Sequence, residues 1–428
     1  MLDVGLTLGV NLGGTLLLFL LQVLLARVLG EVGYSQFSYT FAILTVLTTL
    51  SLFGFDVGIQ RFVPTAIEED NAGELRGYLL RAMQAMLVMA TALGAMLVAS
   101  ALALSGHISE ELQTLLVLAA FAIPGGSLLL LASACARALR KPLLAAAPRL
   151  AVKPLLVIAG IAALALAQPQ LTPSQAMMVE IAASLALAGF VALAVALHLN
   201  PTLRASPASF RTGAWLAVSF PLFLNAGFQI MIRQTDVLIL GGFIGADEVG
   251  SYVVATKIAA LASFGLLAIN AVVPPIVVRH VVRDEHDQAQ RVLGIAALAL
   301  FAFSLGTGLV LWVLGEMILG WFGESFVVAK PLLNLLIMGQ LLNAGTGSVS
   351  FILGVTGHQN VLAKVVAGAL LLNIALCFAL IPAFGAMGAA VAVTLATSAS
   401  NLVLLVLCKS RTGLDPSILS AMRSVTLK

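Results

Sequence analysis

Long apolar runs recur along almost the entire chain, and the short segments between them carry most of the charged residues. Each run holds about 20 or more mostly apolar residues, the length that an α-helix needs to cross a hydrocarbon core about 30 Å thick. A transmembrane β-barrel would instead show strands of alternating apolar and polar residues. The pattern predicts twelve membrane-spanning helices, at residues 5–29, 34–62, 78–104, 112–136, 145–167, 175–198, 213–243, 249–276, 292–314, 329–355, 361–381 and 386–408.

The composition agrees with an all-α polytopic membrane protein. The chain has 428 residues, of which 61% are hydrophobic and 10% are charged, whereas a typical soluble domain has about 25% charged residues. The first apolar run follows Met1-Leu-Asp-Val without a basic n-region or a cleavage site, so we expect no signal peptide. Cys135, Cys377 and Cys408 lie in or beside apolar runs at unrelated spacings, which predicts small buried residues.

The basic residues predict the orientation of the chain. Most of the 22 Lys and Arg residues lie in or beside the loops that follow the even-numbered spans, or in the C-terminal tail. The opposite side of the membrane would hold only Arg27 and Lys330. The positive-inside rule therefore places the basic loops and both termini in the cytoplasm.

An internal repeat divides the chain into two halves. Leu29–Tyr34, at the end of the first span, resembles Ile244–Tyr252, at the end of the seventh, and a second matching pair follows the fourth and tenth spans. Because each repeat holds an even number of spans, the two six-helix lobes are expected to be related by a pseudo-two-fold axis along the membrane normal. The predicted domains are an N-terminal lobe at 1–200, a cytoplasmic linker at 201–211, and a C-terminal lobe with a short cytoplasmic tail at 212–428. Two parallel lobes around a central site are typical of an alternating-access transporter.

The stretch at 224–278 carries charge inside apolar spans. Asn225, Gln229, Arg233 and Asp236 are spaced to share one face of a helix. A charge at the bilayer centre costs about 2.5–3.5 kcal/mol on insertion scales, so such residues usually face a water-filled cavity or a partner. We expect a cavity here; the alternative is that Arg233 and Asp236 pair with each other and only hold helices together.

Further polar residues within spans extend this candidate site. We expect a cationic cavity that binds the substrate, lined by Arg233, Lys257, Arg61, Arg27, Arg149 and Lys153. Uncharged polar residues that could line the same cavity are Asn225, Gln229, Asn11, Gln22, Gln340 and Asn343. Carboxylates that could couple transport to an ion, or pair with the cations, are Asp236, Asp56 and Glu180. Because cations outnumber anions, the set favours an anionic ligand, and phosphate suits arginine and lysine best.

Some of these cations have simpler explanations. Arg27 could extend to the nearby interface, and Arg61 lies where the positive-inside rule alone would place a basic residue. The same holds for Arg137, Arg140 and Lys141, which could also bind anionic lipid headgroups.

No enzyme is expected. The chain lacks a Gly-rich phosphate loop, a zinc-protease motif and a nucleophile elbow, and its loops are too short to build a catalytic site. We expect no metal site, no nucleic-acid partner, and no cofactor beyond a coupling ion or the membrane potential. Among the functional classes, transport is the one that gives charged residues inside membrane spans a role.

Four segments carry a resemblance to a known family. They are Leu29–Phe41, Gly54-Phe-Asp-Val-Gly-Ile-Gln-Arg-Phe-Val-Pro64, Asp236–Gly241 and Val249–Lys257. In order and spacing they resemble the O-antigen flippases (Wzx-like) of the polysaccharide transporter family. That family belongs to the multidrug/oligosaccharidyl-lipid/polysaccharide exporter (MOP) superfamily.

The resemblance implies a fold of two six-helix bundles and a flippase activity. Such a protein moves a polyprenyl-diphosphate-linked oligosaccharide from the inner to the outer leaflet of a bacterial-type cytoplasmic membrane, for O-antigen or exopolysaccharide synthesis. It implies that charged residues handle the diphosphate and sugar, and the matching positions are Arg61, Arg233, Asp236 and Lys257. Other membrane proteins of polysaccharide assembly are expected partners. The alternative is an ion-coupled antiporter of small organic solutes with the same two-lobe fold.

Overall fold

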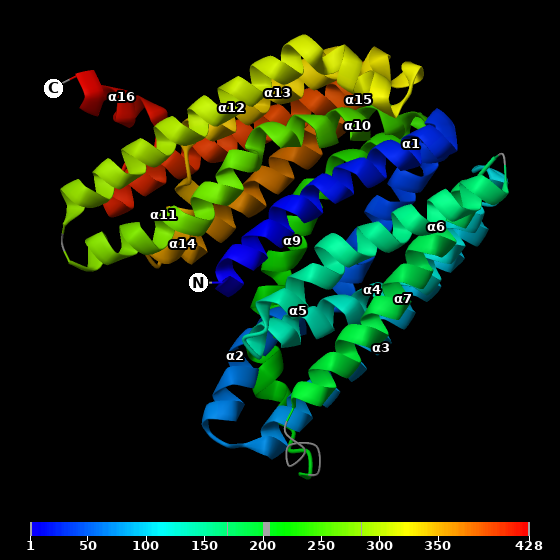
Figure 1. The fold of residues 1–428 in the computed structure, drawn as a ribbon, viewed down its shortest axis with the longest axis horizontal. Coiled ribbons are helices and arrows are strands. Elements are labelled where there is room, and N and C mark those ends of the chain that lie inside the picture. Colours follow the sequence, from blue (N-terminus) through cyan, green and yellow to red (C-terminus); the bar gives the residue numbers. More distant parts are fainter. Residues whose placement is uncertain (1, 169, 200–205, 284, 427–428) are drawn as a thin grey trace. The chain divides into compact units, whose positions relative to one another are not determined.

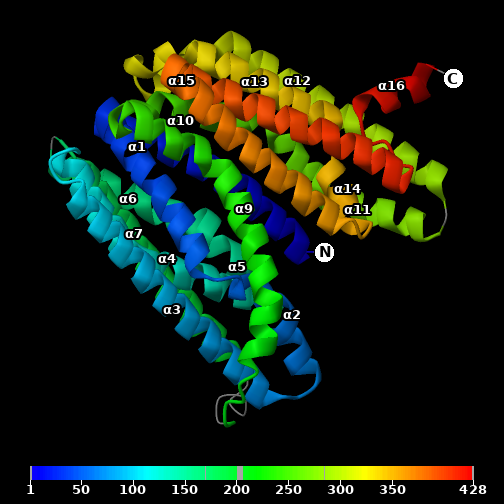
Figure 2. The ribbon, with the colours of Figure 1, turned by 180° about the vertical axis from the view of Figure 1, so that it is seen from behind.

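The protein is helical throughout the residues that the structure describes. The computed structural model describes residues 2–168, 170–199, 206–283 and 285–426. Helices and short turns account for these ranges, apart from an isolated bridge between Ser105 and Ile108. The two opposite views in Figure 1 and Figure 2 show long helices and no strand among the described residues. The predicted all-α fold class is confirmed.

Among the described residues, ten helical segments are long and apolar enough to cross a membrane. Two of them contain a break, because α1 (Leu2–Ser51) is non-helical at Gly30 and α15 (Gln359–Thr412) is non-helical at Gly385. Both glycines have positive φ, of 70° and 54° respectively, which side chains rarely adopt. Each of these two segments therefore contains two consecutive helices, which gives the twelve predicted spans.

The chain forms two compact units, Met1–Ile230 and Met231–Lys428. The N-terminal unit holds six spans and the first part of α9. Its elements after α1 are α2 (Phe55–Glu68), α3 (Ala72–Ala103), α4 (Glu110–Ala138), α5 (Pro142–Ala147), the π-helix η1 (Pro148–Val152), α6 (Lys153–Ala167), α7 (Pro173–His198) and the start of α9 (Thr212–Ile244).

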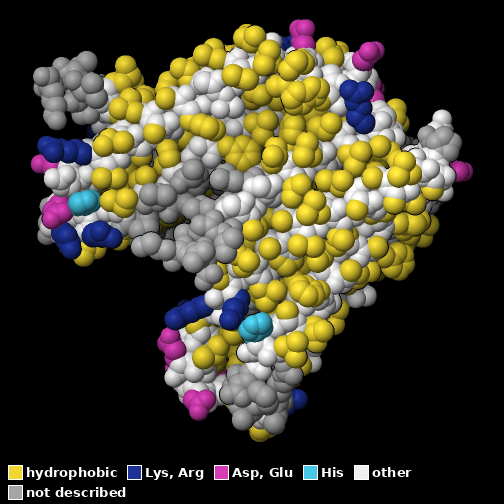
Figure 3. Space-filling view, in the orientation of Figure 1, with side chains coloured by type: hydrophobic (Ala, Val, Ile, Leu, Met, Phe, Trp, Pro, Cys, Tyr) yellow, Lys and Arg dark blue, Asp and Glu magenta, His cyan; other side chains and the backbone are white. Residues whose placement is uncertain are grey.

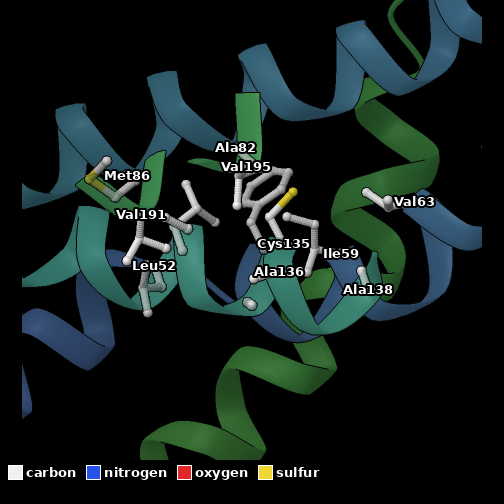
Figure 4. Packing of buried hydrophobic residues seen from close by; sticks show 14 of the residues in the cluster. Leu52, Ile59, Val63, Ala82, Met86, Cys135, Ala136, Ala138, Val191 and Val195 are labelled. Carbon is white, nitrogen blue, oxygen red and sulfur yellow. The ribbon is translucent and has the colours of Figure 1, made fainter. Parts of the chain in front are cut away.

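A buried hydrophobic cluster in the N-terminal unit contains residues of α2, α3, α4, α5, α7 and the start of α9. Figure 4 shows Ile59 of α2 beside Cys135 and Ala136 of α4, with Val195 of α7 close by. Small residues along α4 let the neighbouring helices approach closely, as is usual where helices pack in membranes. The cluster also contains Trp215, so the start of α9 packs into the N-terminal unit.

The C-terminal unit holds the end of the seventh span and the five spans that follow it. Its elements are the end of α9, η2 (Ala246–Glu248), α10 (Val249–Ala259), η3 (Ala260–Ser263), α11 (Phe264–Val282), α12 (His286–Phe322), η4 (Glu324–Ala329), α13 (Lys330–Thr346), α14 (Val349–Val355), α15 and α16 (Ile418–Thr426). The segment before α16 is tied to α12, because the Gln290 amide donates to Asp415 O at 2.7 Å and accepts from Asp415 N at 2.9 Å.

Several connections are shorter than the sequence predicted. The loop expected at 64–77 contains mostly helix, since α2 ends at Glu68 and α3 begins at Ala72. Helices also extend into the segments expected to be loops at 278–290 and 315–327. Hydropathy marks only the apolar part of a helix, whereas these helices continue beyond it with polar turns.

The linker predicted at 201–211 is described only from Ser206 onward. The described part packs on α3: Ser209 N donates to Gly73 O at 2.9 Å, and the Arg76 guanidinium donates to Ser206 O at 2.8 Å. The two compact units divide later, within α9. The predicted lobe boundaries therefore stay a prediction.

The surface has the character expected of a protein that faces lipid. Large apolar side chains are widely exposed, including Leu166 at 92% and Val313 at 74%. Figure 3 shows hydrophobic side chains over most of the visible face of the described residues, with charged side chains gathered near helix ends. Such surface would be unfavourable in water and is normal against hydrocarbon chains.

Candidate functional site

Charged side chains gather inside the N-terminal unit, where Lys153 and Glu180 form an ion pair. Lys153 begins α6 and Glu180 lies two turns into α7, and their side chains are 23% and 7% exposed. The Lys153 ammonium also lies 6.0 Å from the centroid of the Phe41 ring on α1. Lys153, predicted as a substrate-binding cation, is thus neutralised by Glu180, which had been a candidate for either pairing or ion coupling.

A second group of charges, on α2, α4 and η1, lies in the same unit. Asp56 is half-buried in the first turn of α2. Arg137 is exposed in the last turn of α4, and Arg149 is half-buried in η1. Neither arginine makes an ion pair with a described residue. The N-terminal unit thus holds two predicted site residues, Asp56 and Arg149, and also Arg137, for which the sequence left topology and headgroup binding open.

Arg149 lies within a π-helical turn, and the neighbouring prolines explain why that turn forms. Pro148 and Pro154 bracket the segment, and each lacks the backbone N–H that a regular α-helix would use. The helix widens to i→i+5 bonding at Pro148–Val152, with Arg149 inside the widened turn. Such single π-turns occur frequently at functional sites.

In the C-terminal unit, Asp236 is buried and hydrogen-bonded. It is 3% exposed; the Tyr252 hydroxyl donates to its Oδ2 at 2.5 Å and the Val237 N–H donates to its Oδ1 at 2.9 Å. Arg233 is exposed and forms no ion pair with Asp236. The two side chains therefore do not pair in this structure, and the cavity around Arg233 stays a prediction.

Two buried residues of α15 were not among the predicted site residues. The thiol of Cys377 lies 3.8 Å from Asn373 Oδ1. The Asn373 side chain is fully buried, and its amide nitrogen has no hydrogen-bond partner among the described residues. The sequence did contain a signal for this residue, because Asn373 is the lone asparagine in the apolar run at 365–381.

The remaining predicted residues fall into three groups. The side chains exposed at the surface of their own unit are Arg27, Arg61, Asn225, Arg233 and Lys257. Those engaged in hydrogen bonds within their unit are Gln22, which accepts from Tyr34; Gln340, which accepts from Ser263; and Asn343, which accepts from Asn401. Gln229 is half-buried, and the side chain of Asn11 lies outside the described residues. Hence Asp236 has a different environment from Asn225 and Arg233, although all were predicted on one helix face.

Long apolar helices, with charged side chains inside them, define the described part of the chain as a polytopic all-α membrane protein. The sequence profile of the polysaccharide biosynthesis protein family matches residues 2–281. The chain belongs to this family, which confirms the predicted resemblance. The MatE profile matches residues 221–379, and comparison with curated protein sequences gives no match.

Solved structures of the MOP superfamily share the fold. A multidrug resistance MATE family transporter in an inward-facing conformation has a TM-score of 0.74 at 13% identity, with 94% of each chain covered. The lipid II flippase MurJ in an inward closed conformation also has a TM-score of 0.74, at 15% identity, with 94% of this chain and 87% of MurJ covered. A mutant form of the Vibrio cholerae MATE transporter VcmN has a TM-score of 0.64 at 16% identity, with 100% of this chain and 97% of VcmN covered. Family and fold are those of a transporter or flippase.

Proposed function

We propose that this protein is a flippase that moves a polyprenyl-diphosphate-linked oligosaccharide from the cytoplasmic to the outer leaflet, for synthesis of a cell-surface polysaccharide. The membership of the polysaccharide biosynthesis family supports the substrate class. The observation that carries the proposal is a set of cations within apolar spans that make no ion pair with a described residue, namely Arg61, Arg149, Arg233 and Lys257.

Unpaired cations of this kind suit a diphosphate. Keeping a charge in an apolar span is costly, so a retained charge indicates a ligand or an aqueous path. Arginine binds phosphate oxygens through two parallel N–H···O bonds, and lysine adds a mobile point charge. Each of these cations would offer a contact to the diphosphate, and uncharged polar residues such as Asn225 and Gln229 would suit the sugars.

The lipid part of the substrate would remain in the bilayer. Moving its chain into a polar cavity would lose about 0.8 kcal/mol for each CH₂ group withdrawn from hydrocarbon. The polar head would therefore pass through the protein while the chain stays against lipid. Alternating access would come from movement of the N-terminal unit against the C-terminal unit.

Asp236 is the carboxylate that we assign to ion coupling. It is buried, it makes no ion pair with a described residue, and its partners are a tyrosine hydroxyl and a backbone N–H. A buried carboxylate that lacks a fixed cation can be neutralised by a proton or by Na⁺, and either would change the charge of the C-terminal unit. Glu180 is less suited, because Lys153 already neutralises it.

The protein would lie in the cytoplasmic membrane with both termini inside, and would act beside other membrane proteins of polysaccharide assembly. The distribution of basic residues supports this orientation.

An ion-coupled antiporter of small organic solutes is the second candidate. The MatE profile match at residues 221–379 favours it, as does the presence of Asp236 within that range. A cationic drug would require acidic residues to exceed basic ones in the site, whereas the predicted set has the opposite balance.

The test is transport by the purified protein in proteoliposomes. A fluorescent polyprenyl-diphosphate sugar should be flipped by the wild-type protein, and flipping should collapse in Arg233→Ala and in Lys257→Ala. Arg279→Ala removes an exposed cation from the last turn of α11, and flipping should persist in this control. If the protein transported cationic dyes and flipped no lipid-linked sugar, the flippase function would be rejected and the antiporter function supported.

A further inference from the structure

We propose that α16 lies in the headgroup region of the membrane, at the basic end of the C-terminal unit, and docks on anionic phospholipids. The docking surface is the outer face of the helix, formed by Leu419 and Met422. Docking of this kind is independent of the substrate that the protein transports.

The inner face of α16 is fixed on the C-terminal unit. Ala421 is 1% exposed, and a Cβ placed on Gly294 of α12 would lie 3.7 Å from it. The Gln290 amide donates to Ser420 Oγ at 3.2 Å. Two neighbouring residues of α16 therefore hold one side of this helix against α12.

The outer face of α16 presents two large apolar side chains. Leu419 is 65% exposed and Met422 is 56% exposed. The two residues are three positions apart and so share a face of the helix, away from the side that carries Ser420. An exposed apolar face on a short helix outside the spans is typical of a helix that lies in the plane of the membrane interface.

Neighbouring side chains place this face at the edge of the lipid-facing surface. Ala421 packs beside Gly294, and the next residue of α12, Ile295, is 70% exposed; Val406, near the end of α15, is 67% exposed. Both exposed residues belong to apolar runs predicted to cross the membrane, at 292–314 and 386–408. Figure 1 and Figure 2 show α16 turned away from the direction of α12 and α15 at their shared end. Leu419 and Met422 therefore continue the lipid-facing surface sideways.

The charge at this end of the C-terminal unit favours anionic lipid as the partner. The exposed arginines at the ends of α11 and α15 and at the start of α12 are Arg279, Arg283, Arg291 and Arg411. The exposed acids of the connection between α11 and α12 and of the first turn of α12 are Glu285 and Asp287, and Asp415 is paired with Lys409 at 3.5 Å. Basic residues beside an apolar interfacial face attract anionic headgroups.

Docking would connect the membrane surface to a membrane-spanning helix. Gln290, at the start of α12, is hydrogen-bonded both to Asp415 and to Ser420. Because of these bonds, a lipid surface that holds α16 would also hold the start of α12 in place.

Fluorescence of the full-length protein in nanodiscs that contain phosphatidylglycerol tests the docking. The three native cysteines are buried, so a nitrobenzoxadiazole dye can be attached to a single introduced cysteine, in Leu419→Cys or in Met422→Cys. We expect a blue-shifted emission and quenching by lipids spin-labelled near the glycerol that is at least about twofold stronger than in Gln288→Cys. Gln288 is an exposed polar residue in the first turn of α12, and a dye there should be quenched by aqueous iodide instead.

A change of lipid separates apolar insertion from attraction to charge. Quenching by spin-labelled lipid at Leu419→Cys should fall by about twofold or more in phosphatidylcholine alone, and also at high salt, since salt screens the attraction of the arginines. Arg291→Gln should reduce the preference for phosphatidylglycerol, and Arg291→Lys, which keeps the charge, should retain it. Equal quenching in the two lipids would reject the anionic partner.

Other occupants of the outer face would give different results. Quenching by iodide that is as strong at Leu419→Cys as at Gln288→Cys would leave α16 in water and overturn the inference. A dye protected from both quenchers would show that protein covers the face, and loss of this protection in nanodiscs with a single copy would identify a second copy of the chain as the cover. Either result would reject lipid docking. Met422→Cys replaces Leu419→Cys in every comparison if the latter fails to fold.

Discussion

The ion pair with Glu180 limits the interactions that Lys153 can make with a substrate. The two side chains form an ion pair that is mostly buried, with the Phe41 ring near the ammonium group. A buried ion pair adds little stability over apolar residues of the same size, but removing one partner leaves an uncompensated charge. Lys153 can therefore contribute to substrate binding only if a proton neutralises Glu180, or if an anionic ligand replaces Glu180 as the partner of Lys153.

This pairing predicts a double-mutant result. Glu180→Leu and Lys153→Met should each destabilise the protein, by about 3 kcal/mol if the remaining charge stays buried. The double variant should recover most of that loss, because no unpaired charge is left. Unfolding in mixed micelles, followed by circular dichroism, measures the free energies; additive losses in the double variant would mean that the two residues are not coupled.

Tyr252 is expected to control ion coupling through Asp236. Tyr252→Phe removes the hydroxyl that donates to Asp236 and leaves the buried carboxylate with the Val237 N–H. We expect the dependence of the flipping rate on Na⁺ or on pH to shift, while substrate affinity stays unchanged. Tyr34→Phe is the matched control, since Tyr34 is a buried tyrosine that donates to Gln22; an equal shift in this control would exclude a specific role for Tyr252.

Charge inside apolar spans is visible in the sequence, but its pairing is not. Arg149, Lys153 and Glu180 could all be predicted as unusual from their positions alone. The ion pair of Lys153 depends on the packing of α6 against α7. Helical spacing relates residues on one helix and gives no information on which helices meet.

Glycines with positive φ divide helices into shorter pieces. Gly30 separates the first two spans with φ of 70°, and Gly54 begins α2 with φ of 77°. Nothing lies within contact distance of a Cβ placed on Gly30, whereas a Cβ on Gly54 would collide with Ser219 O and Phe223 N of α9. The sequence predicts separate spans around Gly30, but it cannot predict the close approach at Gly54, which involves a helix that follows much later in the chain.

The two glycines should respond differently to alanine. Gly30→Ala is expected to cost about 1–3 kcal/mol from backbone strain alone. Gly54→Ala should cost more, because strain and collision with α9 add together. Gly189→Ala is the control, since Gly189 is an exposed helical residue with open space beside it and alanine favours helix there. Equal melting temperatures for Gly30→Ala and Gly54→Ala would contradict the tight packing at Gly54.

At the scale of the whole molecule, the apolar pattern predicted the number of spans and the fold class. It did so because an apolar run long enough to cross the bilayer has few other uses. The ends of helices were predicted less well, since polar turns continue α2, α11 and α12 beyond their apolar parts. Which cations share one cavity depends on how the two units are arranged, and stays a prediction.

The orientation can be tested with introduced cysteines. The three native cysteines are buried, so a membrane-impermeant maleimide should leave the wild-type protein unlabelled in intact cells. Glu110→Cys, at the exposed start of α4, should react from outside, and Lys141→Cys, just beyond the opposite end of α4, should react only after lysis. The reverse pattern would place the termini on the outer side.

The pairing of Gln290 with the backbone of Asp415 has a consequence for the order in which the protein is made. The two residues are 125 positions apart, so α12 enters the membrane well before the ribosome has synthesised its partner. Until then the Gln290 amide at the start of α12 must be hydrated, and the place later filled by Leu414 stays open. Packing of the C-terminal unit is thus completed only after the last residues are made. A nascent chain that stalls after α15 would expose the Gln290 amide and the surface that Leu414 covers to quality-control proteases.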